Sequence, residues 1–194
     1  MLRGYVRLFQ YGSNMDPNRL NAPDRLRGQA KREGTARLDG WGIRFDLFSK
    51  PNGSAVTDIV KSQSEHVLGV VYQVPARLIC APPHVRSRMD CIEGAKLDGT
   101  GNYEKQRMSV LLNNRPCLVY TYIGTEPGRR RFRSRSKEDR RVSTIYFEYL
   151  MRGARHFPND YRAYLKQRAG SLKQKLTITG SQGIASEEAE GNIQ

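Results

Sequence analysis

The sequence has 194 residues, of which 38% are hydrophobic and 27% charged, and this composition fits one globular domain with a buried core. The formal net charge of +14 favours anionic ligands. Three cysteines and three histidines at irregular spacing indicate neither disulfides nor a metal site. No apolar run is long enough for a secretory signal or a membrane span, so we expect a reduced cytoplasmic protein without cofactor or metal.

The N-terminal half predicts strands interrupted by one short helix. Alternating side chains predict a strand over residues 5–11, and a helix capped by Asp16 follows, with Pro17 at its first position. Residues 34–38 and 41–48 predict two strands joined by a hairpin turn at Asp39-Gly40. Two further strands are predicted over residues 56–60 and 67–74.

The C-terminal half changes from strands to helices. Residues 84–92 predict a short helix, and residues 108–112 and 117–123 predict a hairpin. Residues 129–141, the basic segment, hold eight basic and two acidic residues and predict a solvated loop. Ser143 is the expected N-cap of one helix, and another begins near Pro158.

This order of elements predicts an α+β fold, in which a few helices pack on a small, twisted, mixed sheet that resembles a barrel. We expect one domain over residues 1–170, with the basic loop at residues 126–142. Gly, Ser and Glu become frequent near the end of the sequence. Residues 171–194 therefore predict a mostly disordered tail.

Two short segments hold candidates for chemistry. After the first strand, Gly12 and Ser13 leave main-chain N–H groups open to an anion, although such a turn is more often a plain connection. Glu93 ends an apolar helix before Gly94, where partial burial would raise its pKa and suit it to proton transfer. A lone Glu-Gly is, however, more often a solvated helix end.

Together these segments resemble the γ-glutamylcyclotransferase family, the AIG2-like group. The resemblance extends over about residues 5–165, with the motifs in the family's order. Two departures stand out: Gln10 replaces a small residue, and the basic segment is longer than usual. The matching segments are Tyr11-Gly12-Ser13-Asn14, the strand at residues 66–72, Asp90 with Glu93-Gly94, Asn102-Tyr103, Ser143 to Tyr146 with Gly153-Ala154, and Pro158 to Tyr161.

The resemblance implies a cyclotransferase that releases 5-oxoproline from a small γ-glutamyl compound, whose α-amine attacks its own γ-carbonyl. It implies Glu93 as the acid and base of both proton transfers. Tyr146 would donate a hydrogen bond to the substrate, and Tyr103 is a weaker candidate for the same pocket. The expected binding residues for the glutamyl group, mainly through main-chain amides, are Leu8, Phe9, Gln10, Tyr11, Gly12, Ser13 and Asn14. The leaving group and the oligomeric state stay open.

Two alternatives remain. Cys91 and His84 could form a nucleophilic pair, although Cys91 cannot share a helix face with Glu93 and cysteine is more often simply buried. The basic segment could instead engage nucleic acid or an acidic protein in a module without catalysis. No nucleic-acid-binding motif accompanies it, so nucleic acid is the weaker expectation.

Overall fold

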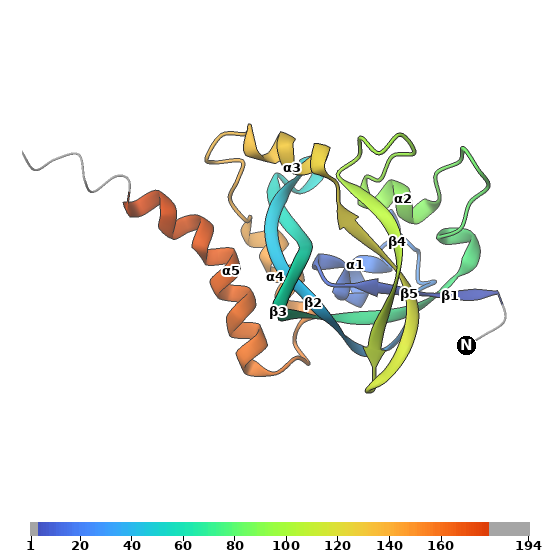
Figure 1. Ribbon diagram of the computed structural model, residues 1–194. Coiled ribbons are helices and arrows are strands. Elements are labelled where there is room, and N and C mark those ends of the chain that lie inside the picture. The colour runs from blue at the N-terminus through green and yellow to red at the C-terminus, as the bar shows by residue number, and fades with distance from the viewer. Residues whose placement is uncertain (1–3, 179–194) are drawn as a thin grey trace, which may run out of the picture.

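The computed structural model describes residues 4–178, and within them five strands close into a barrel (Figure 1). The order around the barrel is β1-β3-β2-β4-β5. β1 and β5 pair in parallel, while the other neighbouring strands are antiparallel. This confirms the predicted α+β fold with a mixed, barrel-like sheet.

The strands carry most of the core, and the helices pack outside and at the ends of the barrel (Figure 1). α3 lies across one end, and α5 runs along the side of β2. None of the helices in residues 4–178 is long and apolar enough to span a membrane. The strands are β1 (Tyr5–Gln10), β2 (Lys31–Ser49), β3 (Ser54–Pro75), β4 (Tyr103–Leu112) and β5 (Arg115–Gly124). The α-helices are α1 (Pro17–Leu20), α2 (Arg88–Glu93), α3 (Glu126–Arg133), α4 (Thr144–Gly153) and α5 (Asn159–Ile178), with 3-10 turns at Ser13–Met15, Lys50–Asn52 and Ala76–Leu78.

β2 and β3 are two long paired strands where four short ones were expected. The predicted hairpin at Asp39-Gly40 is wrong, because the chain continues through it and only the register against β3 shifts there. Gly40 has a φ of +76°. Both a β-bulge and a tight hairpin turn favour glycine with a positive φ, so the sequence Asp39-Gly40 alone does not distinguish a bulge from a hairpin. The turn between the strands is Lys50–Asn52, closed by Gly53 with a φ of +50°.

Local capping and turn signals are confirmed. The Asp16 side chain accepts a hydrogen bond of 3.0 Å from the N–H of Asn18 at the start of α1, and Ser143 caps α4. The β4–β5 hairpin turns at Asn113 and Asn114, which both have a positive φ. These features depend on neighbours in the sequence, which is why the sequence reveals them.

The helix predicted over residues 84–92 begins later than expected. His84 has a φ of +65°, which an α-helix does not accept. Ser87 caps α2 instead, and Ser87 and Asp90 each bond the main-chain N–H of the other. The correction matters because this cap fixes the short helix that ends in Glu93.

The loop predicted for the basic segment is wrong for residues 129–133, which belong to α3, while residues 134–141 form turns and bends as expected. Thr125 caps this helix, and Phe132 anchors it in the core. Arg129 forms a salt bridge of 2.7 Å with Asp58, which is fully buried in β3. A partner about 70 residues upstream leaves no trace in the local charge pattern, so the sequence indicated only a solvated stretch.

The end of α5 also differs from the prediction. The helix continues to Ile178 through residues 171–178, where a disordered tail was expected. Residues 172–176, LKQKL, are good helix formers, and their charge hid that propensity. The rest of the predicted tail, residues 179–194, lies outside the described residues.

Candidate active site

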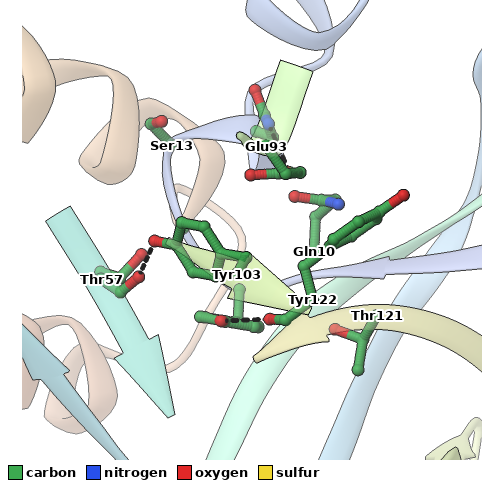
Figure 2. A pocket seen from close by; sticks show the side chains of 10 residues that line it. Gln10, Ser13, Thr57, Glu93, Tyr103, Thr121 and Tyr122 are labelled. Carbon is green, nitrogen blue, oxygen red and sulfur yellow. Dashed lines mark hydrogen bonds between the residues drawn. The ribbon is translucent and has the colours of Figure 1, made fainter. Parts of the chain in front are cut away.

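A small polar cavity opens at the barrel end where β1 and α2 finish, and Glu93 faces it (Figure 2). The structure therefore brings together two segments that lie about 80 residues apart in sequence. The lining residues are Gln10, Tyr11, Gly12, Ser13, Asn14, Thr57, Glu93, Tyr103, Thr121 and Tyr122. We call this space the inner cavity.

Leu8 and Phe9 do not line the inner cavity. Both side chains have 0% exposure and belong to the barrel core. Phe9 contributes its main-chain carbonyl, which accepts a hydrogen bond of 3.0 Å from the hydroxyl of Thr121 on β5. Contact of Leu8 and Phe9 with substrate stays a prediction. Because their side chains are buried, only their main-chain atoms could make this contact.

The short helix α2 is anchored through Asp90, and this anchoring aims Glu93 at the cavity. Tyr122 donates a hydrogen bond of 2.7 Å to Asp90, and the ammonium group of Lys105 lies 3.1 Å from the same carboxylate. Burial acts to raise the pKa of Asp90, but hydrogen bonds from Tyr122 and Ser87 hold it below its usual value. Asp90 is therefore an ionised structural residue one helical turn from Glu93.

Glu93 receives its closest contact from an amide. The Asn14 side chain donates a hydrogen bond of 2.9 Å to Glu93, and the Asn14 carbonyl accepts one of 2.9 Å from Arg25. Arginine can only donate, so Arg25 fixes the Asn14 amide with its nitrogen toward Glu93. Burial raises the pKa of Glu93, opposed by the Asn14 hydrogen bond and the Arg25 charge. A carboxyl group whose pKa is raised in this way is better suited to accept and return a proton.

The turn after β1 packs tightly against β3 and α4. A Cβ atom on Gly12 would lie 2.3 Å from the Thr57 hydroxyl and 3.2 Å from that of Tyr146, so only glycine fits. No main-chain carbonyl among residues 4–178 accepts from the N–H groups of Gly12 and Ser13. The Ser13 N–H instead bonds to the Tyr146 hydroxyl. The predicted binding of an anionic oxygen stays a prediction, in which the ligand would take the Gly12 N–H directly and the Ser13 N–H in place of this hydroxyl.

The tyrosine hydroxyls of the site differ in whether their proton is still available for a hydrogen bond to a ligand. The hydroxyls of Tyr11 and Tyr103 each donate to a main-chain carbonyl, of Tyr122 and Thr57 respectively (Figure 2). Tyr146 accepts a hydrogen bond of 3.0 Å from the Thr57 N–H and lies 2.9 Å from its hydroxyl. Because burial raises its pKa, Tyr146 keeps its proton and can donate it to the Thr57 hydroxyl or to a ligand.

A second space, the outer cavity, adjoins the first at Glu93 and has a volume of about 340 Å³. It shares Ser13, Asn14, Glu93 and Tyr103 with the inner cavity and adds Tyr146. Its basic lining residues are Arg19, Arg25, Lys50 and Arg135. Sequence reasoning missed the first three of these, and it missed Thr57, Thr121 and Tyr122, because no local pattern sets them apart.

The nucleophilic pair of Cys91 and His84 finds no support in the geometry. Both residues are exposed, and no hydrogen bond joins them in the described part of the chain. Cys91 lines the outer cavity on the helix face away from Glu93. Across residues 4–178, no group of three or more His, Cys, Asp or Glu side chains is arranged to hold a metal ion.

Comparison with known proteins agrees with the sequence resemblance. The family model described as Gamma-glutamyl cyclotransferase, AIG2-like, matches residues 8–141. No curated protein matches the sequence. The three solved structures described next are each less than 25% identical to this chain, so their likeness concerns the fold alone.

Three solved structures illustrate the shared fold. One named Gamma-glutamyl cyclotransferase has a TM-score of 0.60 at 17% identity and covers 98% of this chain and 94% of its own. The uncharacterized protein loc79017 from Homo sapiens has a TM-score of 0.65 at 18% identity, covering 99% and 95%. YkqA from Bacillus subtilis has a TM-score of 0.65 at 21% identity, covering 88% of this chain and 56% of its own.

Proposed function

Because the chain belongs to the gamma-glutamyl cyclotransferase, AIG2-like family, we propose that it releases 5-oxoproline from a small γ-glutamyl compound, with Glu93 as acid and base. The observation that carries the proposal is the Glu93 carboxyl itself. It faces the inner cavity, burial raises its pKa, and its contact is the neutral amide of Asn14 rather than a cation. A carboxyl group so placed is free to exchange a proton with a substrate.

The proposed reaction needs two proton transfers and no nucleophile from the protein. The Glu93 carboxylate takes a proton from the substrate's α-ammonium group, and the freed amine attacks the γ-carbonyl carbon. A carbon–nitrogen bond forms, and the carbonyl oxygen becomes an oxyanion. Glu93 then returns the proton to the leaving nitrogen as the original amide bond breaks, and the extra proton left on the ring nitrogen is lost to solvent. The products are 5-oxoproline, a free amine and this proton, and ring closure within one molecule supplies much of the rate advantage.

The remaining residues of the site are proposed to hold the glutamyl group. The main-chain N–H groups of Gly12 and Ser13 can bind its α-carboxylate or the oxyanion, which are the two negative charges of the reaction. Tyr146 can donate a hydrogen bond from the opposite wall. Asn14 keeps the Glu93 carboxyl oriented, and Arg25 keeps Asn14 oriented. Tyr11 and Tyr103 shape the wall, since their hydroxyls already donate to the main chain.

The reading as a non-catalytic basic module has less support. Three arginines of the basic segment are engaged with acidic side chains of the same chain: Arg129 with Asp58, Arg133 with Glu126, and Arg135 with Asp139. These ion pairs leave less positive charge for a nucleic acid than the sequence suggests.

The test is release of 5-oxoproline from a panel of γ-glutamyl amino acids, peptides and amines, measured by chromatography. We expect turnover of at least one compound, and a loss of about a thousandfold or more in Glu93→Gln, whose amide cannot cycle a proton. Circular dichroism and thermal unfolding would check that the variant is folded. Wild-type turnover in a folded Glu93→Gln variant, or no release from any compound, would contradict the proposal.

A further inference from the structure

The charged side chains that line the outer cavity are mostly basic. Four basic side chains line it, and Glu93 is the acidic residue among its lining residues. A concave surface with such a lining concentrates a positive potential within it. Whatever leaves the reaction centre at Glu93 passes into this space, because the inner cavity is much smaller.

Arg19 is held rigidly at the wall of this cavity without an acidic partner. Its guanidinium group stacks 4.2 Å from the centre of the Tyr149 ring and donates a hydrogen bond of 2.8 Å to the Asn52 carbonyl. Its Nε–H is buried and has no acceptor among the described residues. Both contacts are to neutral groups, so they orient the guanidinium group and leave it without an ion-pair partner, although its charge acts on Glu93 across the cavity.

Arg25 is a second guanidinium group in the same condition. Burial lowers its pKa, and the nearby charge of Arg19 lowers it further. Its side-chain hydrogen bond goes to the neutral carbonyl of Asn14, and no carboxylate lies within ion-pair distance of Arg19 or Arg25 in residues 4–178. Two half-buried like charges side by side oppose each other, so an anion bound between them would relieve the repulsion.

The other two basic residues differ from this pair. Arg135 stacks 3.8 Å over the Phe48 ring and pairs with Asp139 at 3.1 Å, so its charge is already compensated. Lys50 is exposed at the β2–β3 turn, where it can add a mobile positive charge at the rim. The basic groups of the outer cavity that are partly buried and have no ion-pair partner are therefore Arg19 and Arg25.

We propose that Arg19 and Arg25 form a subsite for a carboxylate on the leaving group. The preferred substrate is then a γ-glutamyl amino acid or peptide, which expels an amine that bears a carboxylate, rather than a γ-glutamyl amine. This rests on the proposed function, and it narrows the substrate class. Guanidinium groups suit the task because they bind carboxylates through two parallel hydrogen bonds.

The experiment compares three substrates that differ mainly in the charge of the leaving group: γ-glutamylalanine, γ-glutamylalaninamide and γ-glutamylethylenediamine. These leaving groups are anionic, neutral and cationic in turn, and 5-oxoproline release gives kcat/KM for each. We expect the anionic compound to exceed the neutral one by about ten- to a hundredfold, the usual effect of hydrogen bonds to a charged group. The cationic compound should be the poorest.

Arg19→Gln is the informative variant, because Arg19 makes no hydrogen bond to Glu93 or Asn14. Its charge does lower the pKa of Glu93, but this effect is common to all three compounds and cancels in a ratio between them. The ratio of kcat/KM between the anionic and neutral compounds should fall about tenfold, mainly through KM of the anionic compound. Arg115→Gln is the matched control, since it removes one positive charge from the exposed β4–β5 turn, away from the cavity. It should leave the ratio unchanged.

The outcomes separate this inference from the proposed function. Equal kcat/KM for the three compounds would overturn the subsite while the cyclotransferase stands. An equal loss on all compounds in Arg19→Gln would also overturn it, and would indicate binding of the glutamyl carboxylate common to them. If none of the three compounds is turned over, their binding to the Glu93→Gln variant is measured by calorimetry. Tighter binding of the anionic compound would support the subsite without the reaction. Equal binding of all three would overturn both the subsite and the proposed function.

Discussion

Glu93 and Asp46 both have a carboxyl pKa raised chiefly by burial, but their surroundings differ. Glu93 faces a cavity and contacts a neutral amide. Asp46 lies on β2 beside the fully buried Asp58, whose negative charge is the second cause that raises the pKa of Asp46 to about 6. Arg129 joins this pair, with 2.7 Å to Asp58 and 3.8 Å to Asp46.

The comparison teaches that a raised pKa does not by itself indicate catalysis. Asp46 and Asp58 form a closed charge cluster with Arg129, in which one Asp46 oxygen is buried without a hydrogen-bond partner. The cluster fastens α3 to the sheet, since Asp58 also accepts a hydrogen bond of 2.7 Å from the Gly124 N–H. Glu93 differs because a substrate can reach it. Three substitutions test this distinction between Glu93, which is proposed to react, and the carboxyl pair of Asp46 and Asp58, which stabilises the fold.

The largest effect on stability is expected from Arg129→Met. Removing the cation leaves the fully buried Asp58 carboxyl without its ion pair and facing the partly exposed Asp46, which should cost about 3 kcal/mol in the free energy of unfolding at neutral pH. Urea unfolding followed by circular dichroism measures this loss. Arg133→Met is the matched control, because its pair with Glu126 is solvent-exposed and should contribute little to stability. Equal stability of both variants would refute the fastening role.

A smaller change is expected from Arg25→Met, which acts on the reacting carboxyl. The Arg25 charge lowers the pKa of Glu93, so its loss should raise that pKa further. Since the reaction begins with the Glu93 carboxylate, turnover falls as pH drops through this pKa, and the acid limb of the pH profile should move to higher pH. Arg27→Met, at an exposed arginine bonded to the Pro23 carbonyl, should not move it. An unshifted limb in Arg25→Met would argue against Glu93 as the base.

The smallest effect is expected from Asp46→Asn. The folded pKa of about 6 exceeds the ordinary 3.8, so the fold favours the protonated form, and this stabilisation is lost as pH rises through 6. Asparagine stays neutral and should stabilise the protein above pH 6 by about 1 kcal/mol, a modest figure because 32% of the side chain is exposed. Thermal unfolding from pH 4 to 8 should show the stability difference between the two proteins shrinking as the pH falls from 6 toward 4. A gap that is constant with pH would show that Asp46 does not titrate as described.

The sequence predicted features that depend on near neighbours and missed those that depend on distant ones. The caps at Asp16 and Ser143 and the turn at Asn113-Asn114 were recognisable because each is defined within a few residues. The Gly40 bulge and helix α3 were not, because pairing with β3 decides the first, and contacts with the core and with Asp58 decide the second.

The candidate site divides in the same way. The Gly12 turn and Glu93 were found through resemblance to a family, and the structure brings them to one cavity. Thr57 and Tyr122 were not found, because a strand pattern does not reveal which outward position faces a cavity made by other segments. Arg25 was missed because its importance comes from contact with Asn14 across a turn. The roles assigned to these residues stay predictions.

The two cavities share the turn after β1 and the end of α2 but differ elsewhere. The outer cavity alone uses the β2–β3 turn Lys50–Asn52 and Arg135 from the second half of the basic segment. Neither segment belongs to the turn that holds Gly12 or to α2, which ends in Glu93. Under the proposed function, the surroundings of the leaving group can therefore change through these two surface segments while the residues proposed for the chemistry stay the same. Exchanging the two segments between relatives would show how far they alter the choice of γ-glutamyl compound.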